Sequence, residues 1–200
     1  MARDLGTRYF VTETAIKTFS VGYPIQAALD AFLSLRREHS LTPATVDRIV
    51  ATLPEDGARI VDNSAMPDVN CQHLMAVALI DGTVSFEMSH SRERMADPAV
   101  QAVRARVQLV ADKSLMDPAA PRSGRVEVTM SDGQTVTHFT RHAPGTMENP
   151  IEAARLNEKA GDLIAPVLGM RQAEAVIDRV NALESVSDVR ELVALLVRRA

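Results

Sequence analysis

The chain has 200 residues, of which 46% are hydrophobic and 24% charged, and its formal net charge is −4. This composition is typical of a globular domain and excludes a disordered tail, a collagen-like rod and a disulfide-stapled miniprotein. The acidic balance argues against a nucleic-acid partner, which a basic patch would attract. No stretch approaches the roughly 20 unbroken apolar residues of a bilayer span, so we expect no contact with a membrane interior.

The N-terminus and the cysteine content indicate the compartment. Residues 1–17 mix both charges without an apolar run, so they show no secretory signal. Cys71 is the single cysteine, which excludes an intrachain disulfide and suits a reducing environment. We therefore expect a cytoplasmic protein.

The N-terminal part of the chain is predicted to contain both strands and helices. Residues 8–17 alternate β-branched, aromatic and polar side chains, which favours a strand. The apolar residues of 25–37 follow helical spacing and predict an amphipathic helix. The segment 46–54 is predicted to be a strand, and the polar segment 54–68 a loop.

The middle of the chain continues this mixture. Residues 69–80 are rich in Ala, Leu and Met and predict a buried helix that ends at Asp81-Gly82. Four further elements are expected in chain order: a short extended piece at 83–86, a helix at 92–106 that restarts at Pro98, a strand at 107–110, and a hairpin of 125–130 and 134–139 joined at Asp132-Gly133.

The sequence changes character after the turn-rich loop 142–150. Three helices are expected, at 151–164, 170–183 and 186–198, with Pro166 and Gly169 as breaks and Ser187 as an N-cap. The predicted fold class is therefore α+β. A small mixed sheet with helices occupies residues 1–142, and an all-helical C-terminal segment occupies 143–200.

No motif for a bound cofactor or metal occurs in the sequence. A GxGxxG or GxxxxGK[ST] phosphate loop, an HExxH motif, a paired CxxC and a GxSxG elbow are all missing, and the five histidines are scattered. We therefore expect no cofactor and no metal site.

Candidate site residues lie near two helix starts. Lys17, one of three lysines among 22 basic residues, precedes the turn that leads into the 25–37 helix. There its ammonium can pair with a substrate carboxylate at the helix N-terminus, although position alone favours a solvated surface lysine. Tyr23 and Gln26 lie on that turn and the first helical turn, where they can donate hydrogen bonds to the same ligand.

The second group opens the 69–80 helix. Gln72 is a candidate hydrogen-bonding residue, and His73 is either a proton shuttle or a structural hydrogen-bonding residue. Cys71 is expected to be a buried small hydrophobic residue rather than a nucleophile. From the residues alone, the chain is an α+β domain without an assigned function.

Several short segments, in their order and spacing, resemble the C-terminal half of the MmgE/PrpD family. That family includes 2-methylcitrate dehydratase, cis-aconitate decarboxylase and iminodisuccinate epimerase. The resemblance runs from about Leu5 to the last helix. It rests on Ile16-Lys17-Thr18-Phe19, Gln26–Asp30, Asn70-Cys71-Gln72, Ala76–Gly82, Met95–Val100, Pro144–Pro150 and Lys159.

The resemblance implies a fold and a place for the active site. It implies an α+β lid domain, C-terminal helices that return to a large helical domain, and an active site between the two domains. Small di- or tricarboxylates are the implied substrates, and they require cationic and N–H donors and a positioned base. The resemblance leaves dehydration, decarboxylation and epimerisation open.

The resemblance also assigns roles to single residues. Lys17 matches the active-site lysine of the family's Lys-x-[Phe/Tyr]-Pro stretch, in which Ser20 here replaces the proline. Gly22 stands where several members have histidine or cysteine, and a histidine common a few residues later is replaced near Gln26. A proton-transferring imidazole is thus missing from this segment. Lys17 is the implied catalytic residue, with Tyr23, Gln26, Gln72 and His73 as implied substrate-binding residues.

Three interpretations of the chain remain open. In the first, the chain is the lid half of a lyase or isomerase and requires a separate helical-domain chain for activity. In the second, it is a non-catalytic remnant that binds a carboxylate or dimerises. In the third, it is a gene fragment that self-associates as a homo-oligomer through an apolar patch on its last helices, formed by Leu163, Val167, Leu192, Leu195 and Leu196.

Overall fold

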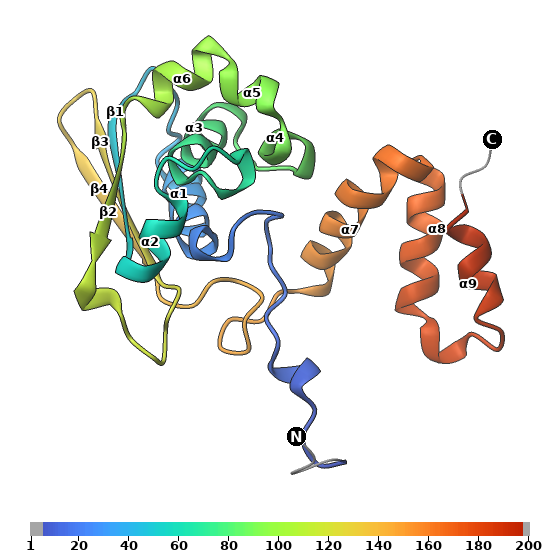
Figure 1. Cartoon of the computed structure of the whole chain (residues 1–200). Helices are drawn as coiled ribbons and strands as arrows, with labels where there is room; N and C mark the ends of the chain where they lie inside the picture. The colour runs from blue at the N-terminus through green and yellow to red at the C-terminus, as the bar shows by residue number, and fades with distance from the viewer. Residues whose placement is uncertain (1–5, 198–200) are drawn as a thin grey trace. The chain divides into compact units, whose positions relative to one another are not determined.

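The computed structural model describes residues 6–197 and divides the chain into two compact units. The first unit ends at Pro150 and the second begins at Ile151. The first combines a sheet with helices, and the second is helical (Figure 1). The predicted α+β class, with a mixed sheet followed by a helical C-terminal segment, is therefore confirmed. The expected domain boundary after residue 142 stays a prediction.

The sheet of the first unit has four strands in the order β2-β1-β3-β4. Their bounds are β1 Val46–Pro54, β2 Val107–Asp112, β3 Gly124–Met130 and β4 Thr135–Thr140. β1 pairs with β2 in parallel and with β3 in antiparallel orientation, and β3 and β4 form the predicted antiparallel hairpin. Burial alternates along β3, so one face of the sheet is covered and the other faces solvent.

Helices α1 (Gln26–Glu38) and α3 (Cys71–Asp81) provide the core that covers the sheet. α1 lies very close to β3, because a Cβ built on Gly124 would be only 2.6 Å from the backbone nitrogen of Ala28. Every residue of α3 from Cys71 to Leu79 is buried, as its apolar composition predicts. α3 is followed by Gly82 at φ +77°, which confirms the predicted helix end.

Shorter helices connect these layers. They are α2 (Glu55–Val61), α4 (Phe86–His90), α5 (Arg92–Ala96) and α6 (Pro98–Arg104), with one-turn 3-10 helices η2 (Tyr23–Ile25), η3 (Pro67–Val69) and η4 (Lys113–Leu115). The predicted restart at Pro98 is confirmed, since the Asp97 carboxylate accepts from the Ala99 N–H and caps α6. No helix among residues 6–197 is long and apolar enough to cross a membrane.

Three predictions for the first unit are wrong in whole or in part. Residues 8–17 contain no strand but the 3-10 helix η1 (Phe10–Glu13), because the Thr12 and Thr14 hydroxyls donate to nearby backbone carbonyls instead of leaving the backbone to a sheet ladder. The polar segment 54–68 contains α2, whose Ala58 and Val61 are buried on one side while acidic residues fill its first turn.

The 83–86 segment also differs from its prediction at its end. Phe86 starts α4 rather than closing an extended piece. The reason is local, because the Ser85 hydroxyl accepts from the Met88 N–H and caps that helix.

The second unit contains α7 (Ala153–Leu168), α8 (Met170–Asn181), the 3-10 helix η5 (Leu183–Ser185) and α9 (Arg190–Leu195). Gly169, at φ +83°, separates α7 from α8 as predicted. The predicted break at Pro166 is wrong, because α7 continues through Pro166 to Leu168. Proline has no N–H to donate to the carbonyl four residues earlier, so the helix gives up one backbone bond near its end. Ser187 does not cap α9, since the Asp188 carboxylate accepts from the Arg190 N–H instead. Residue 198, the predicted end of the last helix, lies outside the described residues.

Candidate functional site

Lys17 lies in a segment that is bound to the loop after the hairpin. The Ile16 N–H donates to the Gly145 carbonyl at 2.8 Å, and the Thr18 hydroxyl donates to the Pro144 carbonyl at 2.9 Å. Both chain neighbours of Lys17 are therefore anchored, while Lys17 itself is exposed. Gly145 has φ +94°, and a Cβ there would lie 1.9 Å from the Ile16 carbonyl oxygen. This crossing of two segments requires a glycine.

A cavity of about 300 Å³ lies next to this crossing, and we call it the Tyr23 cavity. Its wall combines Glu13, Ala15 and Tyr23 with residues from two loops, 118–122 and 141–148. Tyr23 stands at the start of η2, where Pro24 pre-sets the backbone. The structure thus places Tyr23 in a cavity wall. Lys17 is two residues from Ala15 along the chain but is not part of that wall.

Gln26 connects these two candidates as a structural group. Its side chain is buried, its Oε1 accepts from the Phe19 N–H at 3.1 Å, and its Nε2 donates to the Phe19 and Val21 carbonyls. Both amide N–H groups are therefore bound to backbone. In this structure Gln26 holds the segment that leads from Lys17 to Tyr23.

Gln72 braces a different loop. It is buried at the start of α3, its Oε1 accepts from the Asn63 N–H at 3.0 Å, and its Nε2 donates to the Asp62 carboxylate at 2.6 Å. The neighbouring Asn70 caps α3 by accepting from the His73 N–H and donates to the Ser64 carbonyl. Neither of these side chains lines the Tyr23 cavity.

His73 is buried with an imidazole ring that has no hydrogen-bond partner among the described residues. Burial lowers the pKa of this ring to about 4, and the positive charges of Arg104 and Arg94 add to the effect. As the pH falls, the His73 ring therefore becomes protonated near pH 6.5 in the unfolded chain but only near pH 4 in the folded chain. Stability should be lost as the pH falls through that window.

Cys71, two residues before His73 in the chain, is also buried. Burial raises the pKa of its thiol to about 12, and the negative charge of Asp62 adds to the effect. A thiol that stays protonated is a poor nucleophile. The prediction of a buried cysteine is confirmed.

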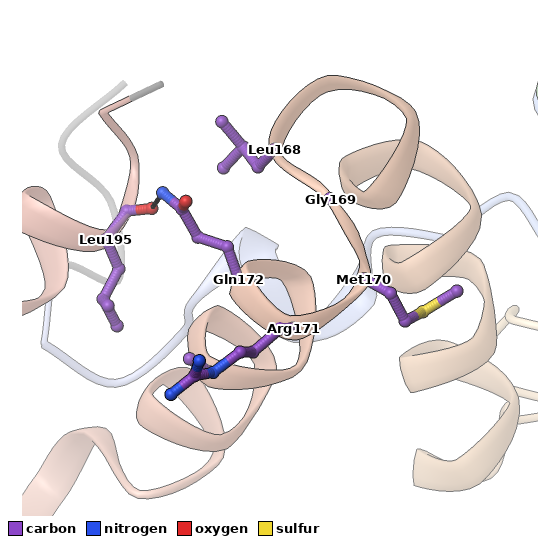
Figure 2. Close-up of a pocket in the computed structure, with 7 residues that line it drawn as sticks. Leu168, Gly169, Met170, Arg171, Gln172 and Leu195 are labelled. Carbon is purple, nitrogen blue, oxygen red and sulfur yellow. Dashed lines mark hydrogen bonds between the residues drawn. The ribbon is translucent and has the colours of Figure 1, made fainter. Parts of the chain in front are cut away.

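A second hollow, of about 480 Å³, lies in the second unit between the α7–α8 junction and α9 (Figure 2). Leu168, Met170 and Leu195 contribute to its wall, and the Gln172 amide donates to the Leu195 carbonyl at 2.5 Å. Arg171 is its one charged lining residue among those described. This hollow holds none of the candidate site residues.

A third hollow, of about 540 Å³, lies over α5 and the start of α6. Its cation, Arg94, donates to the carboxylates of Asp81 and Asp97 at 2.8 and 2.5 Å. Both terminal nitrogens of Arg94 are thereby bound to carboxylates, Nη1 to Asp97 and Nη2 to Asp81. The Tyr23 cavity is the better candidate, because it joins polar side chains from three distant segments.

Sequence reasoning missed three residues of the Tyr23 cavity: Arg122, Arg141 and His142. Each follows a turn or a strand end, and no local motif distinguishes it from other loop residues. Only the pairing of β3 with β4 and the crossing at Gly145 bring these loops to Tyr23. Among residues 6–197 no cluster of three or more His, Cys, Asp or Glu side chains is arranged to hold a metal ion.

Comparison with known proteins gives one family. The family model described as the MmgE/PrpD C-terminal domain matches residues 19–185. The matched range contains Tyr23, Gln26, Gln72 and His73 and begins two residues after Lys17. No curated protein matches the chain.

Proposed function

The chain belongs to the MmgE/PrpD family as a C-terminal domain, and from this premise we propose that it forms the lid side of a lyase or isomerase site. The proposed substrates are small di- or tricarboxylates. The other side of the site would come from a helical domain on a separate chain. The observation that carries this proposal is the anchoring of the Lys17 segment beside the Tyr23 cavity.

Lys17 has the chemistry that such a reaction needs. Removing a proton next to a carboxylate places negative charge on oxygen in the transition state, and a held cation stabilises that charge. The bonds of Ile16 and Thr18 to the 144–145 loop fix the backbone on both sides of Lys17. A fixed backbone limits the positions that the ammonium group can take, which favours catalysis over a freely moving surface lysine.

The surface near Lys17 supports a partner domain. Tyr9, Phe10 and Val11 form an apolar run whose side chains are 60%, 71% and 78% exposed, and Ile16 is 43% exposed. Contiguous exposed apolar side chains of this kind mark interaction surfaces. The proposed helical domain would cover this run and exclude water from Lys17.

The test combines the full chain with a helical-domain chain of the same family and measures turnover of a panel of di- and tricarboxylates. Lys17→Ala should lower kcat about 100-fold or more, the range seen when a charge-stabilising group is removed. Lys113→Ala, which removes an exposed lysine away from the cavity, should stay within about twofold. Equal turnover of the two variants would refute the role of Lys17, and no complex and no turnover would refute the proposed function.

The second candidate function is a carboxylate-binding or dimerising module without turnover, and Gly22 favours it. Gly22 has φ −51°, which any residue adopts, and a Cβ there would meet its nearest neighbours at 3.7–3.8 Å, an ordinary contact. The fold therefore admits a side chain where several family members carry histidine or cysteine. In this case Lys17→Ala would weaken carboxylate binding and no turnover would exist to abolish. Turnover that depends on Lys17 would reject this candidate.

A further inference from the structure

The Tyr23 cavity contains two guanidinium groups that neither the sequence nor the family match assigns. We propose that this cavity is a binding site for a small ligand with two anionic oxygen groups, one for Arg122 and one for Arg141. Carboxylate and phosphate groups share this chemistry. All wall residues belong to the first unit, so the site requires neither the helical domain nor the turnover proposed above.

Arg122 is held in place with part of its hydrogen-bonding capacity unused. Its Nη1 donates to the Asp56 carboxylate and to the Pro121 carbonyl, both at 2.8 Å, and its side chain is 25% exposed. Its bonds to other described residues all use Nη1, so Nε and Nη2 stay available for a ligand. The bond from Arg122 also lowers the pKa of Asp56, which keeps the ion pair charged.

The position of Arg122 depends on close packing around α2. A Cβ built on Gly57 would lie 3.0 Å from the Pro24 side chain and 3.8 Å from Arg122 Nη1. The guanidinium group is therefore located where α2 meets η2, and Arg122 and Tyr23 both line the cavity.

Arg141 directly follows β4 and lines the Tyr23 cavity. Its Nη2 donates to the Asp117 carboxylate at 2.7 Å, and its side chain is 55% exposed. Its bonds to the other residues described use Nη2, which leaves the rest of its fork for a second anionic group. Arg122 and Arg141 thus share one arrangement. An aspartate carboxylate binds one terminal nitrogen of each guanidinium group, and the other N–H groups are left for a ligand.

The acidic side chains of the wall limit the ligand. Glu13 is neutralised by Arg8, which donates to both of its carboxylate oxygens at 2.6 Å. Glu148 is exposed and contributes a negative charge. The volume of about 300 Å³ is at the small end for ligand sites, which span about 300–1,000 Å³. The site therefore fits a compact dianion better than a polyanion or a nucleotide.

The test is a calorimetric titration of the full chain with succinate, 2-phosphoglycolate and, as a single-anion control, acetate. Succinate or 2-phosphoglycolate should bind at least tenfold more tightly than acetate, and the stronger of the two identifies carboxylate or phosphate as the preferred second group. Arg122→Gln and Arg141→Gln should each weaken that binding at least tenfold. Glu148→Gln should tighten it about twofold, because a repelling charge is removed.

Arg48→Gln is the matched control, since Arg48 is an exposed arginine on β1 that bonds to Gln108 away from the cavity. It should leave the affinity unchanged. Arg141→Lys, which keeps the charge but loses the fork, should weaken binding and retain the thermal stability of the chain. No dianion binding tighter than that of acetate, or an equal loss in Arg48→Gln, would overturn the proposal. Dianion binding without turnover in the two-chain assay would refute only the proposed lid function.

Discussion

The crossing of the Lys17 segment over Gly145 leads to a sharp prediction, because a single methyl group should break it. In Gly145→Ala the new Cβ would lie 1.9 Å from the Ile16 carbonyl oxygen, and the backbone there has φ +94°. The two segments must separate, which removes the 2.8 Å bond from the Ile16 N–H to the Gly145 carbonyl. The anchoring of Lys17 should be lost with it.

The magnitude follows from two contributions. A positive φ costs an L-residue about 1–2 kcal/mol, and the lost backbone hydrogen bond costs about 0.5–1.5 kcal/mol. The total is about 1.5–3.5 kcal/mol. Gly133→Ala is the matched control, since Gly133 has φ +85° but no atom within 4 Å of a built Cβ. It should show only the conformational cost of about 1–2 kcal/mol.

Hydrogen exchange of the full chain measures this effect where it arises. Residues 9–14 are exposed, so the segment can detach without unfolding the sheet. The Ile16 amide should lose about 30-fold of its protection in Gly145→Ala, the equivalent of about 2 kcal/mol, and should keep it in Gly133→Ala. An Ile16 amide equally protected in both variants would refute the reasoning.

Three further predictions concern packing, capping and titration. Gly124→Ala places a Cβ 2.6 Å from the Ala28 nitrogen and should cost about 3 kcal/mol or prevent folding, whereas Gly161→Ala, with open space in α7, should stabilise its helix by about 0.5–1 kcal/mol. Urea unfolding that moved both variants in the same direction would contradict the packing of α1 on β3. Asn70→Ala removes the α3 cap and should cost about 1–2 kcal/mol in thermal unfolding, and an unchanged Tm would argue against that cap. His73→Leu should leave stability unchanged or raise it at pH 8. It should also reduce the loss of stability between pH 6.5 and 4 by up to about 3 kcal/mol. If the stability of the wild-type chain and of His73→Leu varied in parallel with pH, the buried neutral ring would be refuted.

Local signals account for the elements that the sequence predicted well. α1 and the β3–β4 hairpin follow from apolar periodicity and from turn chemistry at Asp132-Gly133, both of which act over a few residues. The restart at Pro98 follows from the fixed φ of proline together with the Asp97 cap. None of these features depends on a distant partner.

The wrong secondary-structure predictions concern segments whose conformation depends on distant contacts. Residues 8–17 carry strand-like side chains, but a strand exists only where a neighbour accepts its hydrogen bonds, and the Thr12 and Thr14 hydroxyls satisfy the backbone locally instead. α2 has a polar composition, and the burial of Ala58 and Val61 against the rest of the unit stabilises it. Tertiary contacts decide such segments.

The candidate site shows the same division. By itself the sequence determined the α+β class and the family resemblance, because these depend on composition, periodicity and residue order. It also predicted site residues in the Lys17–Tyr23 segment. Only the tertiary structure placed Arg122 and Arg141 in one wall with Tyr23, bound the Lys17 segment to Gly145, and enclosed the amide of Gln26 in backbone hydrogen bonds. The physical reason is that a cavity is made by chain crossings and strand pairing, which join residues whose local sequences carry no mark of one another.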